Sequence, residues 1–275
     1  MRMKSLAAAL LIACAGSARA QQFGAVGELS GSLAAFKAHA FSADSVGVAG
    51  APASEAPDTT PYPVRGADVS KYQGDIEWAK LGTSGISFVY IKATEGGADV
   101  DPKFERNWKG AKAAGLARGA YHFYDFCQSA GPQAANLIRT VPVVAGDLPP
   151  TIDIEDSRGC RKMPTKEAFQ KSLKVFLAKV EAHYHRKPLL YVNHNIYDRY
   201  LADADGGLKL WIADPHHATP LMPVGTDWTL WQFSWSGRLP GIAGPVDLDV
   251  FRGTPEMLAS LTQPDGTPIM LAALP

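Results

Sequence analysis

From Arg65 to about Leu261, short apolar runs rich in β-branched and aromatic residues alternate with segments whose apolar residues recur at helical spacing. Helices are predicted at residues 75–81, 101–115, 131–141 and 165–185, the last with Thr165 as its candidate N-cap. The β-rich runs predict eight strands, at residues 66–70, 86–94, 118–124, 151–155, 189–193, 208–213, 229–235 and 246–251. Alternation of strands and helices favours a parallel sheet, and eight strands favour its closure. Because the later helices are short or missing, the predicted fold class is α/β, a single irregular (β/α)8-like barrel of the TIM type.

The chain opens with basic residues, an apolar run and small residues in an A-x-A arrangement that ends at Ala20. This order is typical of a secretory signal, so residues 1–20 are predicted to be removed near Ala20 and the protein to be secreted or periplasmic. The run that ends at Cys14 also fits a bacterial lipoprotein signal, and a lipid anchor through Cys14 remains the alternative. No later run is long enough to cross a bilayer.

Composition divides the rest of the chain into three parts. Residues 21–62 are rich in Ala, Gly, Ser and Pro, which predicts a flexible linker. Residues 63–263 contain no internal repeat and are long enough to bury one core, so they are predicted to form one barrel domain. Residues 264–275 are predicted to form a C-terminal tail.

The charge balance limits the classes of partner. The chain has 27 Lys and Arg residues and 27 Asp and Glu residues. Removal of residues 1–20 takes away three basic residues and no acid, which leaves 24 against 27 and a net charge of about −3. This balance offers no basic surface for nucleic acid or for an anionic membrane. We therefore expect no nucleic-acid partner and no membrane span, and we expect a monomer.

Cys127 and Cys160 remain as a pair once Cys14 is assigned to the signal. Cys127 lies just past the third predicted strand and Cys160 just past the fourth, so both are expected on neighbouring loops at one end of the barrel. An exported protein meets an oxidising compartment, in which such a pair forms a disulfide. The sequence therefore predicts the disulfide Cys127–Cys160.

The stretch TIDIEDS, residues 151–157, carries acids among isoleucines. Side chains alternate along a strand, so Asp153 and Glu155 would share one face while Ile152 and Ile154 share the other. Like charges held this close repel each other, and burial adds to the cost, so stability alone does not explain the pair. The two interpretations are a frayed strand end with solvated acids and a general acid with an assisting carboxylate.

Further acids are expected at the same end of the barrel. Function in such barrels gathers at the carboxyl ends of the strands. Asp68 lies in the first predicted strand and Asp247 in the last, and these strands become neighbours when the barrel closes. Aromatic residues in the strands accompany the acids, and aromatic faces with carboxylates suit a carbohydrate; they are Tyr121, Phe123, Tyr124, Tyr191, Trp211, Trp231 and Trp235.

Eight ordered segments between Arg65 and Phe251 match the sequence pattern of a known family. They are RGADVSKYQGDIEWAKL, FVYIKATEG, DPKFERNWKGAKAAGLARGAYHFY, PTIDIED, LLYVN, LWIA, TLWQFS and VDLDVF. In this order they resemble the glycoside hydrolase family 25 lysozymes, the Chalaropsis type. The resemblance implies hydrolysis of the β-1,4 bond between N-acetylmuramic acid and N-acetylglucosamine in peptidoglycan glycan strands, on an irregular barrel. It implies no metal and no cofactor.

The resemblance also assigns roles to individual residues. It places the proton donor on Glu155 and its companion on Asp153, and it aligns the family's aspartates of the first and last strands with Asp68 and Asp247. Glu95 ends the second predicted strand, where either a structural ion pair or a substrate contact is expected. The candidates for substrate contacts are Tyr121, Tyr191, Trp211, Gln232 and Glu95.

The sequence departs from the family pattern at two places. Residues 214–220, DPHHATP, follow LWIA where the family often has an aromatic residue, and Asp249 stands where it often has Asn. In this loop His216 and His217 are residue types that bind metal ions, but consecutive residues rarely coordinate the same ion. No metal site is therefore predicted. His122 is expected to be a hydrogen-bonded residue of the barrel rather than a catalyst.

Two other functions remain open. A chitinase-like hexosaminidase also uses acids at a strand end, but the longer acidic pattern of chitinases is absent around residues 151–156. A barrel that binds glycan without cleaving it is the other alternative, and the presence of both carboxylates argues against it. The sequence does not choose between a retaining and an inverting course.

Overall fold

A computed structural model describes residues 56–156, 160–204, 207–223 and 226–263 of the 275-residue chain, all within a unit of residues 52–275. The predicted signal with Ala20 and Cys14, the linker up to residue 55 and the predicted tail lie outside the described residues. Among the described helices, none is long and apolar enough to cross a membrane.

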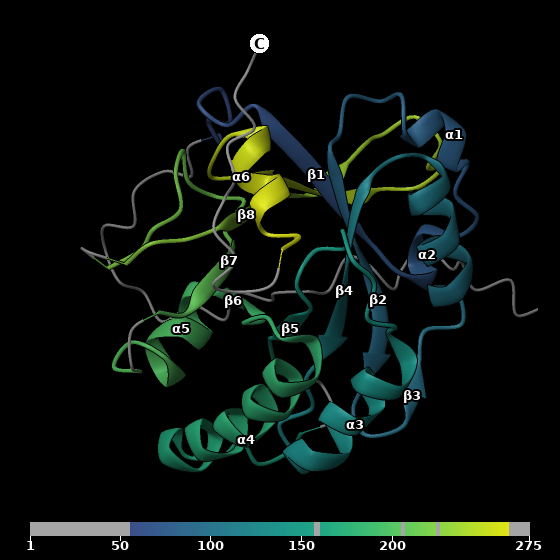
Figure 1. Cartoon of the computed structure of the whole chain (residues 1–275). Coiled ribbons are helices and arrows are strands. Elements are labelled where there is room, and N and C mark those ends of the chain that lie inside the picture. Colours follow the sequence, from purple (N-terminus) through teal and green to yellow (C-terminus); the bar gives the residue numbers. More distant parts are fainter. Residues whose placement is uncertain (1–55, 157–159, 205–206, 224–225, 264–275) are drawn as a thin grey trace, which may run out of the picture. The chain divides into compact units, whose positions relative to one another are not determined.

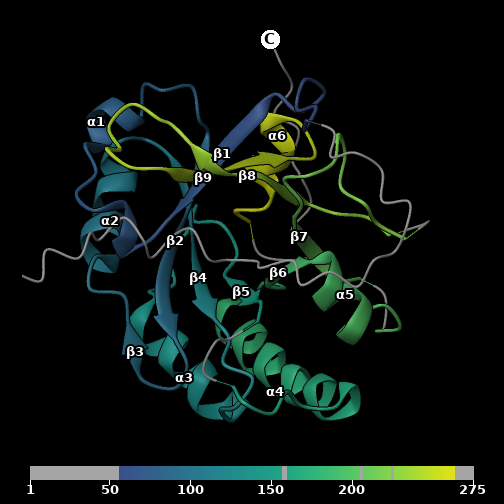
Figure 2. The ribbon, with the colours of Figure 1, turned by 180° about the vertical axis from the view of Figure 1, so that it is seen from behind.

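Eight strands close a barrel, and they coincide with the eight predicted runs (Figures 1 and 2). Around the barrel their order is β1-β9-β8-β7-β6-β5-β4-β2, and the pairing of β1 with β2 closes it. A short strand that the sequence did not predict, β3 (Asp99–Val100), pairs with the end of β2. The predicted barrel is thus confirmed. Its strands are β1 (Val64–Val69), β2 (Phe88–Glu95), β4 (Ala117–Phe123), β5 (Thr151–Ile154), β6 (Leu189–Asn193), β7 (Lys209–Ala213), β8 (Leu230–Gly237) and β9 (Val246–Phe251).

The last strand corrects the prediction of a parallel sheet. The other barrel strands run parallel, whereas β9 is antiparallel to both β8 and β1. Residues 238–245 join β8 to β9 and are too few for the crossover that parallel neighbours need, roughly a dozen residues or more. β9 therefore begins at the end of the barrel where the parallel strands finish, which we call the mouth. This direction places Asp247, its second residue, opposite Asp68 of β1.

Helices cover the outside of the barrel (Figures 1 and 2). Thr165 caps α4, because its Oγ1 accepts a hydrogen bond from the backbone N–H of Ala168 at 3.3 Å. The described residues between β7 and β8 form no helix, which is the expected irregularity. The predicted helices are α1 (Trp78–Leu81), α2 (Phe104–Ala113), α3 (Ala130–Thr140) and α4 (Lys166–Tyr184). Those not predicted are the 3-10 helix η2 (Lys71–Gln73), α5 (His194–Tyr200) and α6 (Pro255–Ser260).

Large side chains fill the middle of the barrel. Phe88 and Tyr90 of β2 point inward, and their neighbours along the strand lie in the outer core between barrel and helices. Glycines on adjacent strands make room for these rings. A Cβ at Gly66 would stand 2.3 Å from the Phe88 ring, and a Cβ at Gly119 would stand 2.1 Å from the Tyr90 ring. One of the two cavities described below opens above this filled interior, and the other lies between the barrel and its helices.

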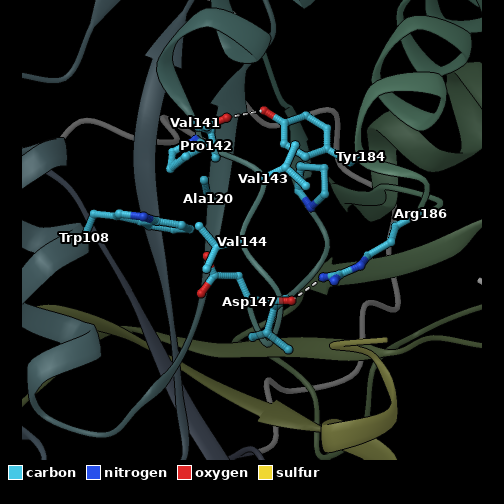
Figure 3. Close-up of a pocket in the computed structure, with 11 residues that line it drawn as sticks. Trp108, Ala120, Val141, Pro142, Val143, Val144, Asp147, Tyr184 and Arg186 are labelled. Carbon is cyan, nitrogen blue, oxygen red and sulfur yellow. Dashed lines mark hydrogen bonds between the residues drawn. The ribbon is translucent and has the colours of Figure 1, made fainter. Parts of the chain in front are cut away.

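A cavity of about 20 Å³ lies near the beginnings of β5 and β6, at the end opposite the mouth, which we call the floor (Figure 3). Asp147 borders it and is 9% exposed. Arg118 of β4 donates hydrogen bonds from Nε and Nη2 to the two carboxylate oxygens of Asp147, at 2.8 and 3.2 Å. The same guanidinium lies 4.1 Å from the centroid of the Trp108 ring, and Arg186 donates to the backbone oxygen of Asp147. Both oxygens of this buried carboxylate therefore have a cationic donor.

Residues 58–62, assigned to the linker, contact the barrel. The backbone N–H of Asp58 donates to the oxygen of Ala218 at 2.9 Å. The ring of Tyr62 meets Trp228 and Trp231 edge-on, with centroids 5.1 and 6.0 Å apart. These contacts attach Asp58 and Tyr62 to the barrel domain, whose predicted start is residue 63.

The structure joins Cys127 and Cys160 in a disulfide, with their Cα atoms 5.3 Å apart. Cys127 follows β4 and Cys160 follows β5. The bond therefore ties together two loops that leave neighbouring strands at the mouth.

Candidate active site

A cavity of about 80 Å³ opens at the mouth of the barrel. Eight of the nine predicted catalytic and substrate-contact residues line it, and Glu95 is the exception. They come from seven strands and from the position directly after β5, so the barrel gathers residues that lie far apart in the sequence. The lining residues are Asp68, Tyr121, Asp153, Glu155, Tyr191, Trp211, Gln232 and Asp247.

Alternation along β5 places the acid pair as the sequence predicts. Ile152 and Ile154 lie in the outer core, while Asp153 and Glu155 both line the cavity. Asp153 is 7% exposed, whereas Glu155, one residue past the strand, is half-buried. The frayed strand end with solvated acids does not describe this site, because Asp153 is buried.

The environment of Asp153 favours its protonated form. One of its oxygens, Oδ1, has no hydrogen-bond partner among the described residues. Burial raises the pKa of Asp153 well above its usual range, and the negative charge of Glu155 adds to that rise, while Lys92 opposes it. An ionised Asp153 is therefore costly until a positive charge or a hydrogen-bond donor enters the cavity.

Two tyrosines wall the cavity and remain protonated. Burial raises the pKa of both Tyr121 and Tyr191 well above the usual range, and the neighbouring carboxylates raise these pKa values further. Tyr191 donates its O–H to Oε1 of Gln232 at 2.9 Å. These hydroxyls can therefore donate to a ligand or to an amide oxygen.

Gln232 links three sides of the cavity through its amide. Its Oε1 accepts hydrogen bonds from the Tyr191 hydroxyl and from Nε1 of Trp235, at 2.9 and 2.7 Å. An indole N–H can donate but not accept, so the amide oxygen must face Trp235. Nε2 of Gln232 then donates to Oδ2 of Asp68 at 2.7 Å. Gln232 thereby orients the Asp68 carboxylate, a link that strand patterns in the sequence do not predict.

Trp211 lines the cavity from deeper in the barrel and is hydrogen-bonded to the buried Asp249. Its Nε1 donates to Oδ1 of Asp249 at 2.9 Å, and its ring meets Tyr191 edge-on at 5.1 Å. Asp249 is fully buried, and its Oδ2 has no hydrogen-bond partner among the described residues. Burial raises the pKa of Asp249 well above its usual range, and the charges of Asp68 and Asp247 raise it further.

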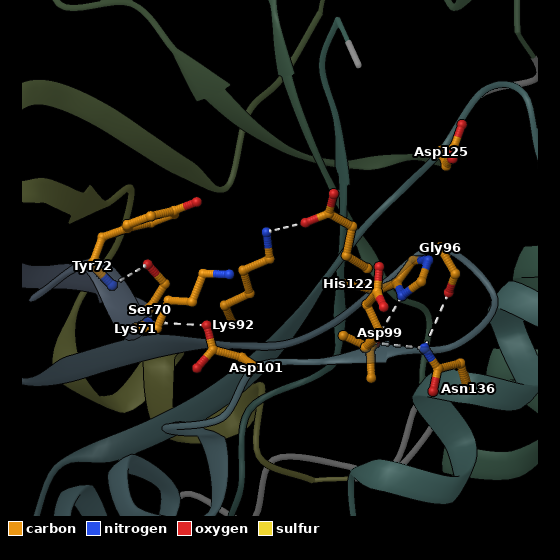
Figure 4. A network of polar contacts seen from close by, with 12 residues as sticks. Ser70, Lys71, Tyr72, Lys92, Gly96, Asp99, Asp101, His122, Asp125 and Asn136 are labelled. Carbon is orange, nitrogen blue, oxygen red and sulfur yellow. Dashed lines mark hydrogen bonds and ion pairs between the residues drawn. The ribbon is translucent and has the colours of Figure 1, made fainter. Parts of the chain in front are cut away.

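Glu95 forms an ion pair rather than part of the cavity wall. Its Oε2 lies 2.6 Å from Nζ of Lys92, whose side chain is labelled in Figure 4. This ammonium lies 4.7 Å from the centroid of the Phe123 ring. Of the two interpretations given for Glu95, the structure shows the ion pair.

The histidines have structural partners. His122 is buried, with Nδ1 2.8 Å from Oγ1 of Thr94 and Nε2 3.2 Å from Oε1 of Gln133. Burial lowers the pKa of His122 to about 4, so it stays neutral as a hydrogen-bonded residue of the barrel, as expected. His217 Nδ1 lies 2.7 Å from Oδ1 of Asp214. Across the described residues, no group of three or more His, Cys, Asp and Glu side chains could hold a metal ion.

Comparisons with known proteins identify the family to which the chain is similar. The family model for glycosyl hydrolases family 25 matches residues 67–242. The uncharacterized protein YegX of Escherichia coli (strain K12) is 40% identical over 202 residues, which cover 72% of each chain. Lysozyme M1 of Streptomyces globisporus is 32% identical over 215 residues, covering 72% of this chain and 71% of its own. The structure of a family 25 glycosyl hydrolase from Bacillus anthracis superposes with a TM-score of 0.69 at 34% identity, covering 78% of this chain and all of that one.

Proposed function

Because the chain belongs to the glycosyl hydrolases family 25, which makes it a glycoside hydrolase, we propose that it hydrolyses the β-1,4 bond between N-acetylmuramic acid and N-acetylglucosamine in peptidoglycan. The family and the enzyme class agree with the sequence prediction. The observation that carries the proposal is the convergence of Asp153 and Glu155 on one cavity, with Asp68, Asp247 and aromatic walls around them.

Glu155 is the proposed general acid. It lines the cavity from the position after β5 and is half-buried, so it can both reach a ligand and exchange its proton with solvent. In cleavage it gives this proton to the glycosidic oxygen as the bond from that oxygen to the anomeric carbon breaks. The leaving sugar then departs as a neutral alcohol.

Asp153 is the proposed partner on the other side of the reaction. The muramic acid residue carries a 2-acetamido group whose oxygen can bond to its own anomeric carbon while the glycosidic bond breaks. Asp153 Oδ1 is buried and lacks a partner among the described residues, so it can accept a hydrogen bond from the acetamido N–H. The cyclic cation that forms is stabilised by the surrounding carboxylates. Water, deprotonated by Glu155, then opens the ring and restores the acid.

The products of digestion test the proposed activity. The protein is incubated with purified peptidoglycan and, in parallel, with chitin, and the new reducing ends are reduced with borohydride and identified. We expect reducing ends of N-acetylmuramic acid from peptidoglycan and little release from chitin, with Glu155→Gln as the matched control. Reducing ends of N-acetylglucosamine, or faster digestion of chitin, would replace the muramidase with a hexosaminidase. Binding of peptidoglycan without release of any reducing ends would point to a glycan-binding barrel.

Export is part of the proposal, and the disulfide supports it. The bond between Cys127 and Cys160 suits an oxidising compartment outside the cytoplasm. The signal of residues 1–20 would deliver the protein there. Mass spectrometry of the mature N-terminus separates the two routes, since cleavage near Ala20 leaves a soluble protein and cleavage before Cys14 leaves a lipidated one.

A further inference from the structure

Trp235 of β8 contacts Gln232, which lines the cavity. Trp235 is 37% exposed, and its Nε1 donates to Oε1 of Gln232 at 2.7 Å. His216, also exposed, meets the Trp235 ring edge-on with centroids 5.3 Å apart. The two rings come from β8 and from the loop after β7, which are neighbours in the barrel. Together they form an exposed surface of an indole and an imidazole ring that contacts the cavity lining through Gln232.

The loop that carries His216 is held in shape by Asp214, whose side chain is buried. The Asp214 carboxylate accepts hydrogen bonds from the backbone N–H groups of His216 and Leu221, at 3.2 and 3.0 Å. The ring of His217 lies 2.7 Å from the same carboxylate, and Trp231 Nε1 donates to the Asp214 backbone oxygen at 2.8 Å. His216 and His217 therefore belong to a loop whose shape is fixed by hydrogen bonds to Asp214. In this loop conformation the ring of His216 contacts Trp235.

We propose that Trp235 and His216 form a sugar-binding platform beside the catalytic cavity. This inference rests on the proposed function, since it takes the ligand to be a glycan chain. A pyranose ring presents C–H groups on its face, and a large, rigid aromatic ring covers such a face at low entropic cost. The hydrogen bond to Gln232 couples the platform to Tyr191 and Asp68. We take the sugar on the platform and the sugar at the acids to belong to one glycan chain, because Trp235 contacts Gln232, which lines the cavity.

Trp235 could alternatively serve only to orient the side-chain amide of Gln232. In that case glycan binding would depend on the indole N–H and not on the area of the ring. Trp235→Phe removes the N–H and keeps most of the ring, whereas Trp235→Ala removes both. The two variants therefore separate an anchor for Gln232 from a surface for a sugar.

Calorimetric binding tests the platform. The parent carries Glu155→Gln, so that the ligand is not consumed, and the probe is a soluble peptide-free oligosaccharide of alternating N-acetylglucosamine and N-acetylmuramic acid. We expect Trp235→Ala to raise Kd about tenfold and Trp235→Phe to raise it about twofold. Trp228→Phe is the matched control, because Trp228 packs against Tyr62 and Trp231 away from the cavity, and it should leave Kd unchanged.

The outcomes separate the platform from the proposed function. Equal losses in Trp235→Phe and Trp235→Ala would overturn the platform in favour of an anchor for Gln232, and an unchanged Kd in Trp235→Ala would overturn it outright. A wild-type protein that releases no reducing ends from peptidoglycan would overturn the activity. In that case a tenfold effect of Trp235→Ala on oligosaccharide binding would still support the platform.

Discussion

At the floor of the barrel, both oxygens of Asp147 accept hydrogen bonds from Arg118, and the cavity beside them measures about 20 Å³. At the mouth, Asp153 and Asp249 each keep one buried oxygen without a hydrogen-bond partner among the described residues. The cavity beside Asp153 measures about 80 Å³. Lys92 is close enough to influence Asp153, but its ammonium pairs with Glu95.

The difference between the two ends separates an acid whose charge is compensated within the fold from acids whose charge is not. A buried carboxylate costs several kcal/mol unless a partner compensates its charge. Arg118 supplies that compensation for Asp147, so the loss of Arg118 alone is expected to destabilise the fold. At the mouth the acids repel one another, and their compensation can come from the positive charge that develops on a sugar ring during cleavage.

The largest effect is expected from Glu155→Gln, which removes the proton and preserves the shape of the side chain. Turnover of peptidoglycan should fall about 10³-fold, within the range that general acid catalysis supplies. Reducing-end release measures the loss, and an unchanged thermal unfolding midpoint shows that the fold is intact. If Glu155→Gln retains turnover within about threefold of the wild type, Glu155 is not the general acid.

At the floor, Arg118→Met should reduce stability rather than turnover. It leaves the buried Asp147 carboxylate without its guanidinium partner, which costs about 3 kcal/mol or more. Denaturant unfolding measures this loss, while turnover per folded molecule stays near that of the wild type. The double variant with Asp147→Leu should recover part of the stability, because no unpaired charge remains. If Arg118→Met alone is as stable as the wild type, the Arg118–Asp147 pair does not have the structural role that distinguishes the floor from the mouth.

Asp153→Asn should impair catalysis about 10²-fold, since a neutral amide stabilises a positive intermediate less well than the carboxylate that Asp153 becomes once positive charge enters the cavity. Its loss should appear in kcat more than in KM, because the interaction strengthens in the transition state. Single-turnover kinetics make this measurement. Mass spectrometry of the wild type with a slow substrate adds a second test, because a glycosyl ester trapped on Asp153 would replace substrate assistance with direct nucleophilic attack.

Asp68→Asn and Asp247→Asn should each lower turnover about tenfold, less than the loss in Asp153→Asn. These residues are register partners at the mouth and act on the field around the reacting sugar. Asn at residue 68 keeps an oxygen that can accept from Gln232. Steady-state kinetics of the two variants make the comparison, and losses equal to that of Glu155→Gln would give these aspartates a direct chemical role.

The sequence predicted much of this site because alternation along single strands is a local property. It placed Asp153 and Glu155 on one face of β5, and the structure agrees. The position of Asp247 depends on strand direction, which follows from the short link between β8 and β9 rather than from the strand itself. A parallel β9 would have carried Asp247 to the floor.

Other features depend on irregular strands and on tertiary contacts, which residue patterns do not encode. Register shifts in β8 on both sides of Ser234 disturb the alternation that would place Trp235. The bulge between Lys92 and Thr94 has the same effect in β2, and across it Lys92 and Glu95, three residues apart, form their ion pair. In a regular strand these two side chains would point to opposite faces.

The smallest effect on turnover is expected from Asp249→Asn, which tests a buried acid at the mouth that does not line the cavity. Asn can still accept the hydrogen bond from Trp211, so turnover should change less than about threefold.

The effect of Asp249→Asn on the free energy of unfolding should depend on pH. The folded pKa of Asp249 is raised above its ordinary value of 3.8, so its contribution to wild-type stability is full below that pH and is lost as the pH rises toward the folded pKa. The variant lacks this loss, and its free energy of unfolding relative to that of the wild type should therefore increase from pH 4 to pH 7. Denaturant unfolding at both pH values measures the change, and a stability difference that stays constant would show that Asp249 does not carry the cost of burial that its surroundings indicate.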